Sequence, residues 1–237
     1  MTPLTLSLGQ LWRYPVKSMA GERIERVTLT AMGVPGDRLV WVRGPEGVRS
    51  ARRQYKLLGL KGTLSPGGEA LVNGHAWHSH AAAELVQAAA GDDAWLELAP
   101  PGDQFDILPL LVATDGAVTA FGRDIRRLRP NLLIAGVDGM DERTWPGATL
   151  EIGRAVIELD SLRPRCPMTT VDPDAITRDP AVLRDIGRRF GGSLALNAAV
   201  TRDGDVALGD PVALVRAAWR PDRPARRRPE RFVAPRP

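Results

Sequence analysis

The sequence predicts a mainly β protein with a few helices (α+β), and three observations favour barrels or sandwiches over a doubly wound sheet. Short runs rich in Val, Leu and Ile are separated throughout by Gly and Pro turn signals. Only two segments combine helix-capping residues with a helix-forming body. Strands and helices do not alternate regularly, as the βαβ units of a parallel sheet require. We therefore expect β-rich domains that carry few helices.

The strand candidates follow one another between turn signals. Residues 148–162 predict two short strands around Gly153, and residues 205–215 predict an apolar stretch after the turn signal RDGD. Further strand candidates lie at residues 22–30, 38–44 and 68–77.

Two helices are marked by their ends. The first is expected between Ser79 as N-cap and Gly91, with an Ala-rich body. The second has Asp179 as N-cap, Pro180 at the first helical position and Gly191 after its end. Its apolar residues recur at helical spacing and form one apolar face, made of Val182, Leu183, Ile186 and Phe190.

Composition divides the chain into two folded parts and a tail. The stretch LELAPPGDQFD is rich in Pro, Gly and Asp, so we expect an N-terminal β-rich domain over residues 1–103 and a second domain over residues 104–218. Residues 219–237 predict a disordered Arg/Pro-rich tail. From Arg220 onwards the tail carries seven arginines against two acidic residues, which exceeds the net charge of +4 for the whole chain. The pI of about 9.8 thus comes from the tail, and we do not expect a nucleic-acid partner.

The compartment predicted from the sequence is cytoplasmic. A single cysteine cannot form an internal disulfide, and no apolar run approaches the ~20 residues that span a bilayer, so no membrane contact is expected. The first residues lack the basic and apolar regions of a secretory signal. The excess of Arg over Lys, with abundant Ala, Gly and Pro, suggests a GC-rich bacterial genome.

That single cysteine, Cys166, has unusual neighbours. Structural cysteines normally lie in apolar strands or helices, whereas Cys166 stands between Arg163, Pro164, Arg165 and Pro167. The prolines stiffen the loop, and nearby guanidinium groups favour the thiolate, which is both the nucleophile and the soft metal ligand. We therefore take Cys166 as the candidate catalytic residue.

The three histidines, His75, His78 and His80, stand together in GHAWHSH. A Cys–His nucleophile pair with Cys166 would need a tertiary contact, and a metal site would need the rings to point the same way. We expect ordinary turn histidines.

One thiolate is too little to hold a free zinc ion, but it can be the single protein ligand of a metal inside an organic cofactor. Such a cofactor needs anion donors, and both halves of the chain offer them. The candidates are Lys17, Ser18, Arg38, Arg52, Arg129 and Asn131.

Motifs in a fixed order connect these residues: YPVKS, TAMG with GDR, SARR, RPNLLIAG, RCPMTTVDPD and LGDPVALV. With them the chain resembles the MOSC-domain proteins, named for the C-terminal domain of molybdenum cofactor sulfurase. It is most similar to the branch of the amidoxime-reducing components and their bacterial relatives. The resemblance implies a β-barrel N-terminal domain, a MOSC β-barrel and a molybdenum cofactor (Mo-molybdopterin) between them.

By motif position, the resemblance makes Cys166 the molybdenum ligand. Lys17, Ser18 and Arg38 would hold the cofactor phosphate, and Arg129 and Asn131 would line the pterin or metal pocket. Arg52 matches a pocket arginine. Arg163 and Arg165 would tune the metal from outside its coordination sphere.

The resemblance implies a reductase of N-hydroxylated or N-oxide compounds that receives electrons from a separate flavoprotein or ferredoxin-type donor. The alternative is a persulfide carrier that uses Cys166 in metal–sulfur cofactor assembly, without the pyridoxal-phosphate domain of the larger sulfurases. Asp172 and Asp174 could relay protons, although an Asx-type turn is the favoured interpretation of DPD.

Overall fold

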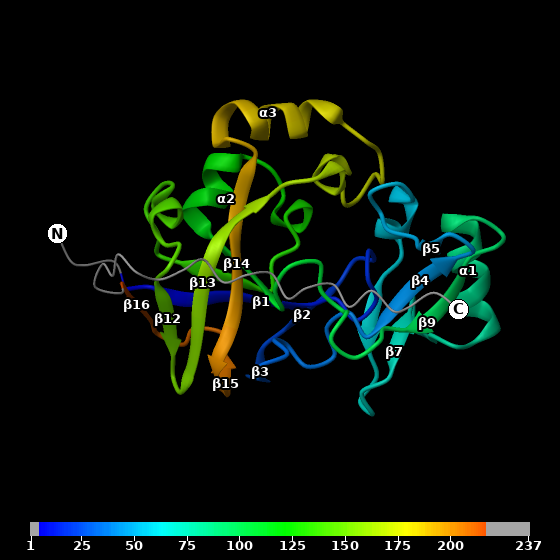
Figure 1. Ribbon diagram of the computed structural model, residues 1–237, viewed down its shortest axis with the longest axis horizontal. Helices are drawn as coiled ribbons and strands as arrows, with labels where there is room; N and C mark the ends of the chain where they lie inside the picture. The colour runs from blue at the N-terminus through cyan, green and yellow to red at the C-terminus, as the bar shows by residue number, and fades with distance from the viewer. Residues whose placement is uncertain (1–4, 217–237) are drawn as a thin grey trace, which may run out of the picture.

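The computed structural model describes residues 5–216. It is built from short strands with three α-helices, which confirms the predicted fold class. Figure 1 shows a larger part with a long sheet beneath α2 and α3, and beside it a smaller part that contains α1. The predicted disordered tail, residues 219–237, lies outside the described residues.

The larger part contains an eight-stranded sheet in the order β16-β12-β13-β14-β10-β11-β1-β2. Only β10 and β11 pair in parallel within it. In chain order its strands are β1 (Ser7–Arg13), β2 (Glu22–Ile24), β10 (Leu110–Thr114), β11 (Leu132–Ala135), β12 (Thr149–Ile152), β13 (Ala155–Pro164), β14 (Ser193–Arg202) and β16 (Val212–Val215).

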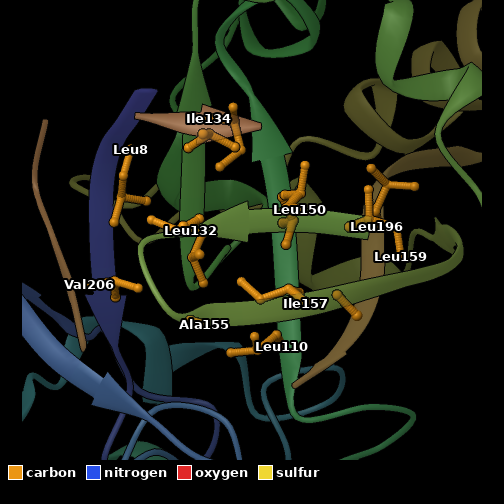
Figure 2. Close-up of a cluster of buried hydrophobic side chains, with 14 of the residues drawn as sticks. Leu8, Leu110, Leu132, Ile134, Leu150, Ala155, Ile157, Leu159, Leu196 and Val206 are labelled. Atoms are coloured by element: carbon orange, nitrogen blue, oxygen red, sulfur yellow. The ribbon is translucent and has the colours of Figure 1, made fainter. Parts of the chain in front are cut away.

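Backbone contacts bring the start of β16 back to β1. Ser7 forms an isolated bridge with Pro211, and the amide of Val212 donates to the carbonyl of Leu6 (2.9 Å). The sheet therefore curls around one core, whose side chains converge in Figure 2. A two-stranded sheet of β3 (Arg26–Leu29) and β15 (Gly204–Ala207) adds Leu29 and Val206 to this core.

The smaller part has a separate core built around α1 (His80–Ala90). One three-stranded sheet holds β4 (Val40–Gly44), β5 (Gly47–Val48) and β9 (Trp95–Leu98). The other holds β6 (Gly62–Leu64), β7 (Ala70–Val72) and β8 (His75–Ala76). The remaining short helices of the chain are η1 (Tyr55–Gly59), η2 (Ile125–Arg127), η3 (Asp141–Thr144) and η4 (Pro167–Thr170).

The N-terminal segment passes from one core to the other. Leu11 on β1 belongs to the core of the large sheet, whereas Val16 and Met19 belong to the core around α1. Lys17 and Ser18 stand between Val16 and Met19, so two buried side chains of the core around α1 flank them, a few residues after the chain leaves the large sheet.

The predicted caps are confirmed. Ser79 accepts a hydrogen bond from the amide of Ala82 at the start of α1 (3.2 Å). Asp179 accepts from the amide of Ala181 at the start of α3 (Pro180–Phe190), with Pro180 in its first turn (2.9 Å). The hairpin around Gly153 is present as β12 and β13.

A helix that the sequence analysis did not expect, α2 (Asp115–Phe121), follows β10 directly. It is capped by Thr114, whose hydroxyl accepts from the amide of Ala117 (3.2 Å). No helix within residues 5–216 is long and apolar enough to cross a membrane.

Candidate functional site

Cys166 follows the end of β13, the strand that runs the length of the large sheet (Figure 1). Its carbonyl accepts from both the amide and the hydroxyl of Thr169 (3.0 and 2.9 Å), so the turn of η4 holds its backbone in place. The thiol is half-buried and free. The structure thus presents Cys166 on a stiff turn between the two parts of the molecule.

Two arginines of the same segment are held by the large sheet and its loops. Arg163 donates to the side-chain oxygen of Asn197 on β14 (3.0 Å), and Arg165 donates through Nη2 to the carbonyl of Leu128 (2.8 Å). Burial lowers the pKa of Arg165 to about 10, and the charge of Cys166 is the largest opposing influence. The arginines therefore place positive charge beside the sulfur, as the sequence predicted.

Arg165 also carries a buried donor without a partner among the described residues. Its Nε has no accessible surface and no hydrogen bond. An unpaired buried donor is costly in free energy. It marks a position beside Cys166 where an acceptor group would be stabilised.

Tyr14 lies between two predicted cofactor residues. The guanidinium carbons of Arg129 and Arg38 lie 4.2 and 5.4 Å from its ring centroid. Its buried hydroxyl donates to the carbonyl of Pro130 (3.0 Å), and burial raises the pKa of this hydroxyl. Arg129 also donates to the carbonyl of Met19, the residue after YPVKS (2.5 Å). Through Tyr14 and Met19, Arg129 thus connects the RPN motif to the YPVKS segment.

Three of the predicted cofactor residues have left-handed backbone conformations. Ser18, Arg38 and Arg129 have φ of 72°, 55° and 57°. Only six residues other than glycine have positive φ in the part of the chain that the structure describes. Such conformations cost free energy and cluster at functional sites, where the surrounding structure over-determines them. The backbone thus marks this junction independently of the side chains.

Asp37 contacts several residues of the same region, although it was not among the residues predicted from the sequence. Its side chain is buried, accepts from the amide of Tyr14 (2.6 Å) and pairs with Arg38. It also accepts from the side-chain amide of Asn131 (3.0 Å).

Asn131 is itself committed to protein partners. It is 1% exposed, and its side-chain oxygen accepts from the amide of Leu111 (3.1 Å). With its nitrogen on Asp37, it supports the site from within the structure. Its predicted role as a direct cofactor contact stays a prediction.

Asp106 is a second carboxylate that the sequence analysis did not select. It accepts from Lys17 and Arg52 (2.8 Å each), and Arg163 lies 3.8 Å away. Burial opposes its ionisation, but these cations together hold the pKa of this carboxyl below its usual range. Cations from both halves of the chain therefore converge on one carboxylate.

The histidines and the DPD motif make local contacts. His78 and His80 are exposed beside Glu69 and Glu84, and no cluster of metal-binding side chains occurs within residues 5–216. Asp172 accepts from the amides of Asp174 and Ala175 (3.0 and 2.9 Å), which is an Asx turn. The turn thus accounts for the DPD motif.

A cavity of about 640 Å³ adjoins this region. Tyr14, Arg129 and Met168 form part of its wall, whereas Lys17, Arg38 and Cys166 do not. The cavity wall thus includes the Tyr14–Arg129 contact but neither Cys166 nor the cations Lys17 and Arg38.

Fold and site together define a β protein of two parts, with a free thiol and three cations near their junction. We call these cations, Lys17, Arg38 and Arg52, the cation cluster. A protein-family model described as the MOSC N-terminal beta barrel domain matches residues 5–93, and the model of the MOSC domain matches residues 116–213. The chain belongs to the MOSC-domain family. Its N-terminal β-barrel domain and following MOSC domain are those expected from the sequence.

Curated relatives point to one branch of the family. Mitochondrial amidoxime reducing component 2 of Macaca fascicularis is 36% identical to the chain over 75 residues, which are 29% of this chain and 22% of that protein. The Homo sapiens protein of the same name is 35% identical over 75 residues, with the same shares. The chain thus matches about a fifth of the length of these relatives.

Among solved structures, the YuaD protein of Bacillus subtilis superimposes with a TM-score of 0.51 at 13% identity. The match covers 90% of this chain and 97% of that chain. This similarity supports a shared fold.

Proposed function

We propose that this protein is a molybdenum-cofactor-dependent reductase of N-hydroxylated or N-oxide compounds, with Cys166 as the protein ligand of the metal. The observation that carries the proposal is the arrangement of one free thiol and a cation cluster at the domain junction. The match to amidoxime-reducing components supports the substrate class.

The residues present fit such a cofactor. A phosphate needs several donors, and Lys17, Arg38 and Arg52 bring positive charge to the junction. The unpartnered Nε of Arg165 offers a further donor beside the thiol. A thiolate is a suitable ligand for a soft metal centre. Ser18, buried in a left-handed conformation next to Lys17, presents a hydroxyl donor.

The protein's own contribution is to position and to charge the site. The turn of η4 fixes the backbone of Cys166. Asp37 binds both the amide of Tyr14 and the guanidinium of Arg38, and so fixes their relative positions. Arg163 and Arg165 supply a positive field around the sulfur, which stabilises negative charge there. When bound, the cofactor would supply the two-electron chemistry that cleaves an N–O bond, with two protons consumed and one water released.

Electrons would come from a separate donor protein of the flavoprotein or ferredoxin type. The small-molecule substrate would reach Cys166 from its solvent-exposed side, since the thiol is only half-buried.

The persulfide carrier is the second candidate, because it also needs an accessible thiolate. A carrier needs neither several cations beside its thiol nor an arginine donor without a partner, so these two features favour the reductase. Mass spectrometry separates the two: in protein without molybdenum, a gain of about 32 Da on Cys166 that a thiol reductant removes would indicate a persulfide and hence the carrier, whereas a sulfinic acid of similar mass would persist.

An activity assay tests the proposal. The protein, expressed in a host verified to make molybdopterin, should oxidise reduced methyl viologen in the presence of benzamidoxime and release benzamidine. The Cys166→Ala variant should lose this activity. Wild-type protein that contains the cofactor but reduces neither amidoximes, hydroxylamines nor N-oxides would contradict the proposed function.

A further inference from the structure

Three consecutive residues of the segment between the two domains lie on the cation cluster. The carbonyl of Gln104 accepts from Lys17 (3.4 Å), and the ring of Phe105 lies under the guanidinium of Arg38 (5.8 Å). Asp106 accepts from Lys17 and from Arg52 (2.8 Å each). We call residues 104–106 the anion strap. It contacts two residues to which the cofactor phosphate was assigned, Lys17 and Arg38, and the predicted pocket arginine Arg52.

The carboxylate of Asp106 supplies the negative charge that a phosphate would bring to these cations. It meets Lys17 and Arg52 from the N-terminal domain, and Arg163 from the MOSC domain lies 3.8 Å away. Its side chain is 38% exposed, so solvent reaches the ion pairs. A half-exposed ion pair contributes little free energy and can be exchanged for another anion.

The segment that carries Asp106 is suited to move. It has several turn-forming residues, and Gly102 has a φ of 90°. Its residues 103–106 belong to no helix or strand, whereas Lys17 and Arg163 are anchored next to the two cores. If the ion pairs of Asp106 break, we therefore expect residues 103–106 to move and the cations to stay in place.

We propose that the anion strap is an internal competitor of the cofactor phosphate: Asp106 holds the cations together in the absence of an anion and is displaced when one binds. This inference rests on the proposed cofactor site. Like charges repel, so a phosphate and the Asp106 carboxylate cannot share the same cations without a loss of affinity. Asp106 therefore lowers the affinity for the anionic end of the ligand. Binding of that end requires the anion strap to move away from the cations.

Binding of inorganic pyrophosphate to the purified protein without cofactor, measured by calorimetry, tests the proposal. The Asp106→Asn variant keeps the shape of the side chain but removes its charge, and it should bind pyrophosphate at least about tenfold more tightly than the wild type. Asp103→Asn is the matched control, since Asp103 lies in the same segment and makes no ion pair with the described residues; its affinity should equal that of the wild type. Lys17→Gln should weaken binding.

Equal or weaker binding by Asp106→Asn would overturn the proposal and would make Asp106 an organiser of the cations. Unchanged binding by Lys17→Gln would also overturn it, because the anion would then lie elsewhere. Hydrogen exchange of the wild type gives a readout that needs no variant: pyrophosphate should accelerate exchange in residues 102–107, and slower or unchanged exchange would contradict displacement.

These outcomes are separable from those of the proposed function. Tighter binding by Asp106→Asn in a protein that never contains molybdenum would support the strap and reject the reductase. Molybdenum in the wild type, with weaker pyrophosphate binding by Asp106→Asn, would support the reductase and reject the strap.

Discussion

The guanidinium carbon of Arg129 lies 4.2 Å from the ring centroid of Tyr14, and this contact joins the RPN motif of the MOSC domain to the YPVKS motif of the N-terminal segment. Arg38 approaches the same ring at 5.4 Å, so one aromatic side chain receives two of the predicted cofactor residues. The ring of Tyr14 thus contacts both arginines, whereas its hydroxyl donates to the carbonyl of Pro130.

Two variants of Tyr14 separate ring from hydroxyl. Tyr14→Phe removes the hydrogen bond to Pro130 and should cost about 1 kcal/mol of unfolding free energy. Tyr14→Ala removes the buried ring and should cost about 3–5 kcal/mol. Urea unfolding of the two variants measures the difference. Equal losses would show that the ring does not support the arginines.

The buried carboxylate of Asp37 connects Arg38 to the backbone of Tyr14. Asp37→Asn keeps its shape but leaves Arg38 without its charged partner, and breaking a buried pair should cost about 3 kcal/mol. Asp203→Asn, at an exposed position, serves as the control for urea unfolding. A loss no larger than that of the control would mean that Asp37 does not hold Arg38 in place.

Local signals in the sequence were sufficient for much of the fold. Ser79 and Asp179 predicted both capped helices because a cap is a contact within one turn, and Gly153 predicted a hairpin for the same reason. Helix α2 was missed because it is short: its seven residues make about two turns, too few to show a helical period, and Gly116 lies in its first turn.

The site was only partly predictable. Lys17, Arg38, Asn131 and Cys166 belong to recognisable motifs, but some of the carboxylates that hold them lie far away in the sequence. Lys17 meets Asp106 across 89 positions, and Asn131 meets Asp37 across 94. A single sequence contains no period or spacing that reports such contacts. GDR drew attention to Arg38, and the same three letters hold Asp37.

A buried carboxylate behind the site makes stability depend on pH. Glu142 is fully buried, accepts from the amide of Ala195 and the hydroxyl of Thr114 (2.9 Å each), and burial raises the pKa of its carboxyl above its ordinary value of 4.5. The folded state therefore holds the proton more tightly than the unfolded state. The stability that this group contributes is present below pH 4.5 and is lost as the pH rises through the folded-state pKa.

Glu142→Gln cannot ionise. Its side-chain oxygen can accept from the amide of Ala195, and its NH2 group can donate to the hydroxyl oxygen of Thr114, which reverses that hydrogen bond. Relative to the wild type, its unfolding free energy should increase as the pH rises above 4.5. Glu151→Gln, at an exposed position of β12, should show no such change. A difference between Glu142→Gln and wild type that is constant with pH would contradict the proposed ionisation.

The positive field around the sulfur has a chemical consequence. The pKa of Arg163 is lowered by burial, and Asp106, Arg38 and Cys166 are among the charges that act on it, so charge on the sulfur and the guanidinium interact. Arg163→Gln should slow alkylation of Cys166 by iodoacetamide severalfold at neutral pH, because the thiolate loses a stabilising cation. Arg154→Gln, on an exposed turn before the start of β13, should alkylate at the wild-type rate. Equal rates for both variants would exclude Arg163 from the field at the sulfur.

The most direct test of the central claim is the molybdenum and pterin content of wild-type protein and of Cys166→Ser, both purified from a molybdopterin-producing host. We expect about one molybdenum and one pterin per wild-type chain, and loss of most of the metal in Cys166→Ser, because a hydroxyl is a poor substitute for a thiolate ligand. Wild-type protein without molybdenum, or a serine variant that retains it fully, would contradict Cys166 as the ligand.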